Sequence, residues 1–403
     1  MATPSKVHLD VSESPEYHRP GITQESAKKA SELLQENHEI HHIFFNQSGF
    51  HNHIAHHLLT IYALNTPPNL LQKQYDNNKS YQRSPEPLMA SEVSQMHDPE
   101  HFKGFLGNER YYHDFLKFFQ DEMEEKGWEN VLNEYLFAAD ERADDMLARL
   151  LQLLDEVHTE KSLAEAAKNG LPNRIREGIL AKAADTMINI VKQYRVQPGQ
   201  LEEETAAMTN AAAYFTGAAQ HPPKVVKMDF FYMHCINCSI FFSAFLKQSW
   251  LSEANKVRLL EWKVRNDLIM YASRGSPNLL LDEVVNYKPK KPSKDAKDPW
   301  DDIIDRVRQY EDDGHGAKLV RALAHGQKIC EPYEDRESFR IKKNMWLQLG
   351  HMAIDSVEGP EPEWVRGCGF DDAWEKVADR PRDSMEAEDH PKQSKAPQGS
   401  AYE

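Results

Sequence analysis

Apolar side chains recur every three or four residues along most of this chain, and this spacing limits the fold more than any other feature. It is the spacing of one buried face of an α-helix. The pattern also begins after Thr23, a good helix cap, with Ser26 as an alternative cap. The other helical patterns cover residues 50–64, 111–126, 131–156, 181–194, 228–245, 256–274, 300–312 and 317–324. No Asn-Gly or Asp-Gly turn separates alternating apolar runs, so we predict an all-α fold with very little sheet.

The polar and proline-rich stretches lie at the two ends and in one loop. Residues 1–21 contain three prolines and little apolar periodicity, which predicts a flexible arm. Residues 284–299 mix lysines with prolines and are expected to form a solvated loop, and residues 383–403 have the composition of a disordered tail. No linker separates two self-contained cores. We therefore predict a single large multi-helix domain over residues 22–382.

The charge and cysteine content exclude several classes of protein. The net charge of −16 disfavours binding to nucleic acid or to anionic membranes, because both attract basic surfaces. Four cysteines are too few for a disulfide framework, and no secretory signal is present at the start, so we expect a cytoplasmic protein. The most apolar stretch, residues 230–246, is shorter than the roughly 20 residues of a membrane span.

Histidine is the most unusual component of this sequence. The chain has 19 histidines, and seven of them fall within residues 38–57. His53 and His57 share one helical face, and neutral imidazole is the commonest side-chain metal ligand. Ile54 stands where a zinc-protease HExxH motif needs glutamate, so that class is disfavoured. Helical histidines are more often core or surface residues than ligands; within this cluster we favour His56 or His57 as a direct metal ligand.

Three more histidines stand in apolar or helix-breaking surroundings. His234 lies within the apolar stretch DFFYMHCINCSIFF, where burial requires a hydrogen bond or a metal, and a satisfied core histidine is equally compatible with it. His315 lies between two glycines, and Lys318 follows it on the helix that begins there. His351 lies in WLQLGHMAIDS. Such residues suit a pocket assembled from several helices.

Aromatic side chains near these histidines are candidates for binding a planar ligand. Tyr62, Phe231 and Trp346 are the residues that we predict to contact it, because aromatic rings stack on flat molecules.

Five segments, in this order, resemble the questin oxidase-like family: HNHIAHHLLTIYALNTPPNLLQKQYDNN, VLNEYLFAADERADDMLARLL, DFFYMHCINCSIFF, DDGHGAKLVRAL and WLQLGHMAIDS. The resemblance covers about residues 27–382, and the HHLLTIYAL and DDGHxxK blocks are its most specific parts. Members are fungal tailoring enzymes of aromatic polyketide pathways, including Baeyer–Villiger-type oxidases. The resemblance implies an oxidoreductase that uses dioxygen to insert oxygen into, or cleave, a ring beside a quinone carbonyl.

The resemblance also implies cofactors and site residues. Family members are described as NADPH-dependent, and some hold a non-haem iron through histidines and a carboxylated lysine. The family's histidine positions match His57, His234, His315 and His351. Lys318 and Lys343 are the lysines nearest the matching blocks, and with His56 they are the candidate catalytic residues. No GxGxxG fingerprint supports a dinucleotide fold, whereas histidine-rich sites with open positions suit Fe(II).

The chain departs from the family after Leu151. Relatives continue there with a segment that contains a His-Pro-Leu-Ile-His-Leu-Gly-like motif, whereas this chain continues with LLDEVHTEKSLAEAA, where His158 is the single histidine. Loss of a ligand or pocket wall there gives the alternative function, a catalytically impaired helical binding protein for a planar aromatic ligand. Ligand binding without turnover under air would favour this alternative.

Overall fold

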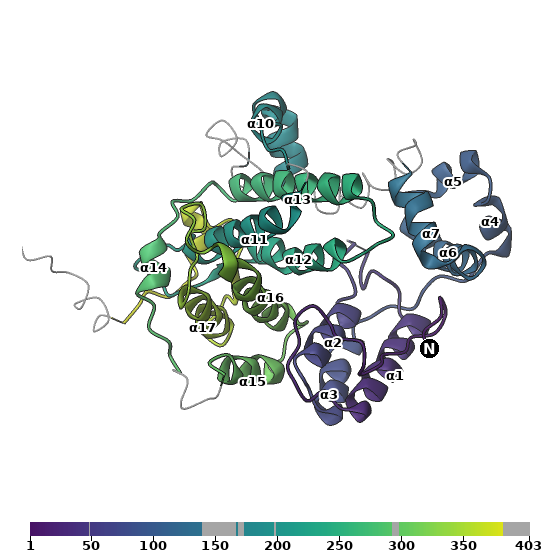
Figure 1. The fold of residues 1–403 in the computed structure, drawn as a ribbon, viewed down its shortest axis with the longest axis horizontal. Helices are drawn as coiled ribbons and strands as arrows, with labels where there is room; N and C mark the ends of the chain where they lie inside the picture. Colours follow the sequence, from purple (N-terminus) through teal and green to yellow (C-terminus); the bar gives the residue numbers. More distant parts are fainter. Residues whose placement is uncertain (48, 139–166, 168–172, 197–198, 292–297, 382–403) are drawn as a thin grey trace, which may run out of the picture.

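The computed structural model describes residues 1–47, 49–138, 167, 173–196, 199–291 and 298–381 (Figure 1). Within these residues the fold is helical, with two strands of two residues each, so the all-α prediction is confirmed. The first group of helices is α1 (Gln24–Ile40), α2 (Ile54–Ala63), α3 (Pro68–Lys79), α4 (Ala90–Gln95), α5 (Pro99–Phe105), η1 (Glu109–Tyr111), α6 (Tyr112–Lys126), α7 (Trp128–Leu132) and η2 (Asn133–Phe137). The second group is η3 (Arg174–Leu180), α10 (Ala184–Val191), α11 (Leu201–Ala218), α12 (Phe230–Leu246), α13 (Glu253–Ser273), α14 (Leu281–Val285), α15 (Asp301–Gln309), α16 (His315–Cys330), η4 (Glu331–Tyr333), α17 (Met345–Val357) and η5 (Asp371–Trp374).

Local sequence signals set the boundaries of the first helices. The Thr23 hydroxyl oxygen accepts a hydrogen bond from the Ser26 backbone N–H at 3.2 Å, so Thr23 is the cap of α1 as predicted. Helix α2 ends at Ala63, before Asn65 takes a left-handed φ of 59°. Pro68 then starts α3, a position where a missing N–H costs nothing.

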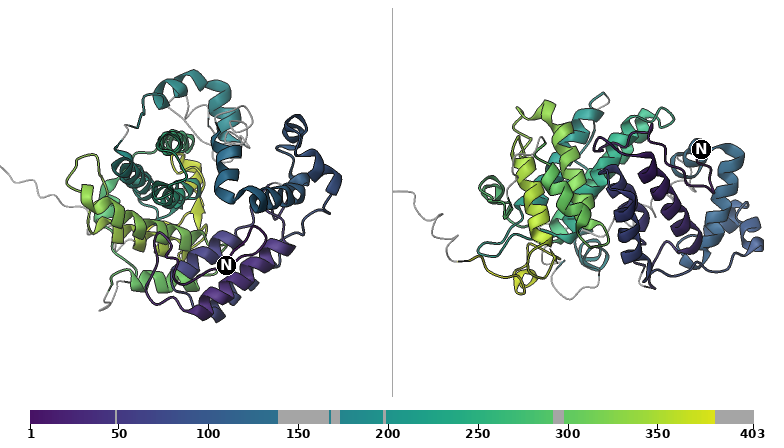
Figure 2. Two further views of the ribbon diagram at one scale, coloured as in Figure 1. Left: turned by 45° about the vertical axis from the view of Figure 1, so that its right-hand side comes forward. Right: turned by 90° about the horizontal axis from the view of Figure 1, so that it is seen from below.

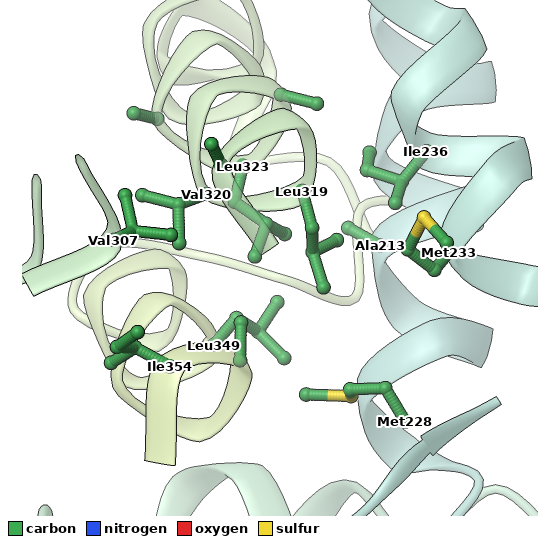
Figure 3. Packing of buried hydrophobic residues seen from close by; sticks show 14 of the residues in the cluster. Ala213, Met228, Met233, Ile236, Val307, Leu319, Val320, Leu323, Leu349 and Ile354 are labelled. Atoms are coloured by element: carbon green, nitrogen blue, oxygen red, sulfur yellow. The ribbon is translucent and has the colours of Figure 1, made fainter. Parts of the chain in front are cut away.

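Helices α11, α12, α16 and α17 pack together and form the main hydrophobic core (Figure 3). In the close-up, Leu319 and Leu323 of α16 lie between side chains of α17, such as Leu349, and of α12, such as Ile236. This core positions the inward faces of α12 and α16, which carry His234 and His315.

The N-terminal helices lie against one side of this core. Helices α1, α2 and α3 pack on one another, and α2 also contacts α16 (Figures 1 and 2). Helices α4 to α7 form a separate group with its own aromatic cluster around Phe102 and Phe118. The histidines of α2 and His234 of α12 therefore reach α16 from two different groups of helices.

The two short strands connect distant parts of the chain. β1 (Met228–Asp229) and β2 (Trp364–Val365) pair in parallel, with Met228 opposite Trp364 and Asp229 opposite Val365. This pairing holds the segment after α17 against the beginning of α12.

Residues 1–21 contain no helix, yet they contact the helices at several points. The backbone N–H groups of Val7 and Leu9 donate to Gln35 and Ser31 of α1. Arg19 forms ion pairs with Asp298 and Asp301 at the start of α15. The segment predicted to be a flexible arm is thus anchored to the folded helices.

The predicted loop 284–299 is also partly anchored. Val284 and Val285 belong to α14, and Asp355 of α17 accepts hydrogen bonds from the Tyr287 hydroxyl at 2.9 Å and the Lys290 backbone N–H at 2.8 Å. Residues 292–297 lie outside the described residues.

Other predictions also fall outside the described residues: the part of the 131–156 helix beyond residue 138, the departure after Leu151 with His158, and the tail 383–403. Among the helices that are described, none combines the length and the apolar character needed to cross a membrane.

Candidate metal centre

Three helices bring histidines from distant parts of the sequence together. His53 is the residue before α2, His234 lies in the second turn of α12, and His315 is the first residue of α16. The ring centroids of His53 and His315 are 4.7 Å apart, and those of His234 and His315 are 5.1 Å apart. Residues separated by more than 250 positions therefore share one site.

Asp313 links two of these rings. One carboxylate oxygen of Asp313 is hydrogen-bonded to Nδ1 of His315, and the other lies 3.2 Å from Nδ1 of His53. A potential ligand atom from each of His53, Asp313 and His315 lies within 4.8 Å of the other two. This grouping of two imidazoles and one carboxylate is the size of the ligand shell around a single metal ion.

Several ring nitrogens at this site are buried without a hydrogen-bond partner among the described residues. They are Nδ1 of His53, which is near Asp313 but not aligned for a hydrogen bond, Nε2 of His57 and Nε2 of His315. A buried polar atom without a partner costs about 1–3 kcal/mol. A metal ion would satisfy such nitrogens, so these residues fit a divalent metal.

The backbone turn between α15 and α16 packs against the ring of His57. Gly314 has a left-handed φ of 91°, and a Cβ atom there would lie 2.5 Å from Cγ of His57. The Asp312 carboxylate accepts hydrogen bonds from the N–H groups of Gly314 at 2.7 Å and Gly316 at 2.8 Å. Only glycine allows this close approach of the turn to the His57 ring.

Burial keeps the imidazoles neutral. Burial, together with the smaller effect of nearby Lys318, lowers the pKa of His53 and of His57 to about 3. Burial also lowers the pKa of His234 well below its usual value. Neutral imidazole is the form that binds metals, so these histidines are in the ligand form at neutral pH.

Lys318 is a buried lysine next to this cluster. Its Nζ donates to the backbone oxygen of Asp313 at 3.2 Å, and burial lowers its pKa to about 8. An appreciable fraction of this amine is therefore uncharged near neutral pH, in contrast to an exposed lysine.

Aromatic rings flank the histidines. The Phe230 ring centroid lies 4.9 Å from that of His234 and 5.0 Å from that of His315. Trp364 of β2 lies 6.4 Å from His315. The site thus has an apolar aromatic side, which suits a flat organic ligand.

Of the other predicted residues, two lie near this cluster. His56 packs against Phe241 of α12, with 5.7 Å between ring centroids, and burial lowers its pKa to about 2. Phe231 lies edge-on to Phe230 and is covered by Arg274.

The structure does not bring the remaining predicted residues to the cluster. His351 of α17 is buried, and the charged groups that act on it are Asp355, Arg306 and Asp302 of α15 and α17. Lys343 is exposed in the loop before α17, where it takes a left-handed φ of 49°.

Two of the aromatic residues predicted to bind the ligand belong to the core. Trp346 is fully buried against α16, where Gly326 leaves room for its ring. Tyr62 is buried as part of the main hydrophobic cluster and faces the acidic residues Asp10 and Glu13 of the N-terminal segment.

His53 and Asp313 were not among the ligands expected from the sequence. The i, i+4 spacing of His53 and His57 indicated that these two rings share a face. Asp313 stands two residues before His315, in the family block DDGHxxK, but nothing in the sequence shows that its carboxylate reaches back across the turn to two imidazoles.

Fold and site together define an all-helical protein with a cluster of histidines and a carboxylate suited to a divalent metal. The model of the questin oxidase-like family matches residues 50–153 and 149–323. The oxidoreductase AflY of Aspergillus parasiticus is 35% identical, over 91% of this chain and 86% of that protein. The Baeyer-Villiger oxidase ptaJ of Pestalotiopsis fici is 34% identical over 87% of this chain and 93% of its own, and a questin oxidase of Aspergillus terreus is 32% identical over 94% and 98%.

The chain belongs to the questin oxidase-like family, and it is an oxidoreductase. The two parts of the family match overlap at residues 149–153, close to Leu151, after which we predicted a departure from the family pattern.

Proposed function

We propose that this enzyme uses dioxygen for Baeyer–Villiger-type oxygen insertion into, or oxidative cleavage of, a ring of an aromatic, anthraquinone-like polyketide. The observation that carries the proposal is the cluster of His53, Asp313 and His315, with a bare His57 nitrogen beside it. The names of the relatives, questin oxidase and Baeyer-Villiger oxidase, support the same type of reaction.

The proposed metal is Fe(II), held by His53, His57, His234 and His315 with Asp313 close by. When bound, Fe(II) would supply the one-electron chemistry that lets dioxygen react with an organic ring. Asp313 accepts the Nδ1–H of His315 and thereby leaves the lone pair of Nε2 free, which is the usual way that a carboxylate orients a histidine ligand.

Lys318 is the lysine that we assign to the role of the carboxylated lysine. Carbon dioxide adds to an uncharged amine, and burial keeps the pKa of Lys318 at about 8, close enough to neutrality to supply one. The product would be a carbamate, whose anionic oxygens would add to the ligands of a site dominated by neutral imidazole. Lys343, by contrast, is exposed.

The aromatic side of the site is the proposed binding surface for the flat substrate. Phe230 and Trp364 both lie within ring-contact distance of His315. Rings placed there would exclude water from one face of the substrate and hold its plane beside the histidines.

The need for NADPH depends on the fate of the second oxygen atom. Insertion of one atom of dioxygen requires two electrons to reduce the other atom to water, and we propose that NADPH supplies them. A cleavage that places both atoms in the product requires no NADPH. The described residues contain no strand longer than two residues, and therefore no βαβ unit for a dinucleotide.

The test is a turnover assay with questin as substrate, under ¹⁸O₂, with and without NADPH and Fe(II). We expect one of two results. Either the product carries one labelled oxygen and the reaction consumes one NADPH, or the product carries two labelled oxygens and the reaction needs no NADPH. A His315→Ala variant should lose the activity and the bound iron together. Full activity in the metal-free protein would contradict the proposed role of iron.

The alternative is a binding protein for planar aromatic compounds without catalysis. The division of the family match into two parts at residues 149–153 favours it, because a missing segment there can remove part of the site. Tight binding of questin, with no product under any of the four conditions above, would establish this alternative.

A further inference from the structure

Two arginines lie against the aromatic residues at the beginning of α12. The guanidinium carbon of Arg366 is 3.9 Å from the ring centroid of Phe230 and 6.0 Å from that of Phe231. The guanidinium carbon of Arg274 is 4.1 Å from the centroid of Phe231. Arg366 follows β2, and Arg274 follows the end of α13, so the strand pairing and the end of a helix place both arginines near Phe231.

Neither guanidinium forms an ion pair of 4.0 Å or less with any carboxylate of the described residues. Asp229 is the nearest candidate, but its two oxygens accept four backbone N–H groups: those of Phe231 at 2.8 Å, Tyr232 at 3.3 Å, Gly367 at 2.6 Å and Cys368 at 3.0 Å. Asp313 is occupied by His315 and His53. The nearby carboxylates are therefore used by other donors.

The chain has a net charge of −16, yet neither of these two arginines has a direct acidic partner among the described residues. Arg274 is 5% exposed, and its Nε donates to the Ser273 hydroxyl at 2.8 Å. Burial lowers the pKa of Arg274, because taking a cation out of water is unfavourable, and the charge of Asp229 opposes this shift. A bound anion would offset this cost.

Phe230 connects Arg366 to the histidines of the metal site. Phe230, which lies under Arg366, also contacts the His234 and His315 rings. A molecule that reaches from Arg366 to the histidines must therefore pass along an aromatic surface. Arg366 is exposed, whereas Arg274 is buried.

We propose that Arg366 and Arg274 bind an anionic oxygen group, a carboxylate or phenolate, of the aromatic substrate and so orient its ring system toward His315. This inference rests on the proposed function for the identity of the substrate. Guanidinium groups suit the task because they bind carboxylate oxygens through paired N–H donors and stack on aromatic faces at the same time.

The experiment compares the affinities of two probes for the full-length protein. Anthraquinone-2-carboxylate and anthraquinone-2-carboxamide have nearly the same shape and differ in charge. We expect the wild type to bind the carboxylate about 10-fold more tightly than the carboxamide in isothermal titration calorimetry. The Arg366→Gln variant should bind both probes with nearly equal affinity.

Two further variants complete the design. Arg340→Gln removes an exposed arginine from the loop before α17 and should keep the carboxylate preference. Arg274→Lys retains a cation but not the planar fork and should weaken the preference several-fold. If Arg274→Lys fails to fold, the binding measurements on Arg366→Gln still test the proposal, because Arg366 is exposed.

Equal binding of the probes by the wild type would overturn the proposal, and so would an unchanged preference in Arg366→Gln. Binding of NADP⁺ that depends on Arg366, without any preference for the carboxylate, would assign the arginines to a dinucleotide phosphate instead and would also overturn it. The preference should persist in His315→Ala. This distinguishes the anion site from the proposed oxidation, which that variant should abolish.

Discussion

A histidine that binds a metal needs one ring nitrogen hydrogen-bonded and the other free to coordinate the ion. The pair of Asp313 and His315 provides this arrangement. The carboxylate is hydrogen-bonded to Nδ1, while Nε2 is buried without a partner. His57 contributes a second bare nitrogen, and its pKa of about 3 keeps the ring neutral. At the residue scale the site thus combines buried imidazole nitrogens with one carboxylate that contacts His315 and His53.

Substitution of Asp313 should weaken metal binding without removing a histidine. We expect Asp313→Asn to lower the affinity for Fe(II) by about 10- to 100-fold, because His315 loses the anionic acceptor that orients it. Metal content measured by mass spectrometry after dialysis against a chelator series checks this. His351→Gln is the matched control, since His351 lies among residues of α15 and α17. Loss of metal in His351→Gln would contradict the site as described.

A second histidine prediction concerns stability. His325 of α16 is buried, its Nε2 lies 2.8 Å from the Ser243 hydroxyl, and burial lowers its pKa to about 4. The unfolded chain, with a pKa near 6.5, takes up a proton first as the pH falls. The stability contributed by neutral His325 is therefore complete above pH 6.5 and is lost between pH 6.5 and about pH 4.

The expected size of this loss is about 2 kcal/mol between pH 7 and pH 5. His325→Gln keeps a hydrogen-bonding side chain but cannot be protonated, so its unfolding free energy should fall less over this range by about that amount. Urea unfolding at both pH values measures the difference. Identical pH dependence in the two proteins would show that His325 is not the group responsible.

At the scale of elements, the turn between α15 and α16 combines three functions. Asp312 caps the backbone of the turn, Gly314 lets it approach His57, and His315 starts the helix that carries Lys318. The block DDGHGAK is therefore both a helix start and part of the site.

Gly314→Ala should damage both the turn and the site. The new Cβ would lie 2.5 Å from His57 Cγ, and the φ of 91° is unfavourable for alanine. We expect a loss of about 1–3 kcal/mol of stability and most of the bound metal. Gly316→Ala is the control: its Cβ would meet nothing closer than 3.4 Å, so stability should be unchanged or slightly higher. Thermal unfolding and metal content would be measured together.

The helices that could be predicted from the sequence are those with a clear start signal or an apolar stripe. Thr23 identified the beginning of α1, and the apolar run from Phe230 identified α12. Helix α11 was missed because it is buried on nearly all sides, with small residues such as Ala212 and Ala213 in place of an apolar stripe. A helix surrounded by neighbours has no polar face to produce periodicity.

At the scale of the whole molecule, the N-terminal segment contacts three helices that are far apart in the sequence, α1, α15 and α16. Val7 and Leu9 bond to α1, while Arg19 pairs with the start of α15. The backbone oxygen of Tyr17 accepts a hydrogen bond from Arg321 of α16 at 3.0 Å. Contacts of this kind, made with partners far along the sequence, leave no local pattern in a segment rich in proline.

Removal of residues 2–18 should therefore lower the unfolding temperature, by about 2–4 °C for each kcal/mol of lost contacts. Differential scanning fluorimetry of the shortened and full-length proteins measures the shift. A chain lacking residues 383–403, predicted from their composition to be a disordered tail, is the comparison and should unfold at the original temperature. An unchanged unfolding temperature after the N-terminal deletion would instead support the prediction from the sequence that residues 1–21 form a flexible arm.

The sequence by itself determined the helical character of the described chain and the family, because helical periodicity and short motifs are local properties. It also determined that histidines and a lysine near DDGHGAK are the candidates for chemistry. Only the tertiary structure decided which of them meet: it joins His53 to Asp313 and His315, and it separates His351 and Lys343 from them. The physical reason is that the directions of buried side chains are set by the packing of whole helices, and no spacing along one segment encodes the position of another.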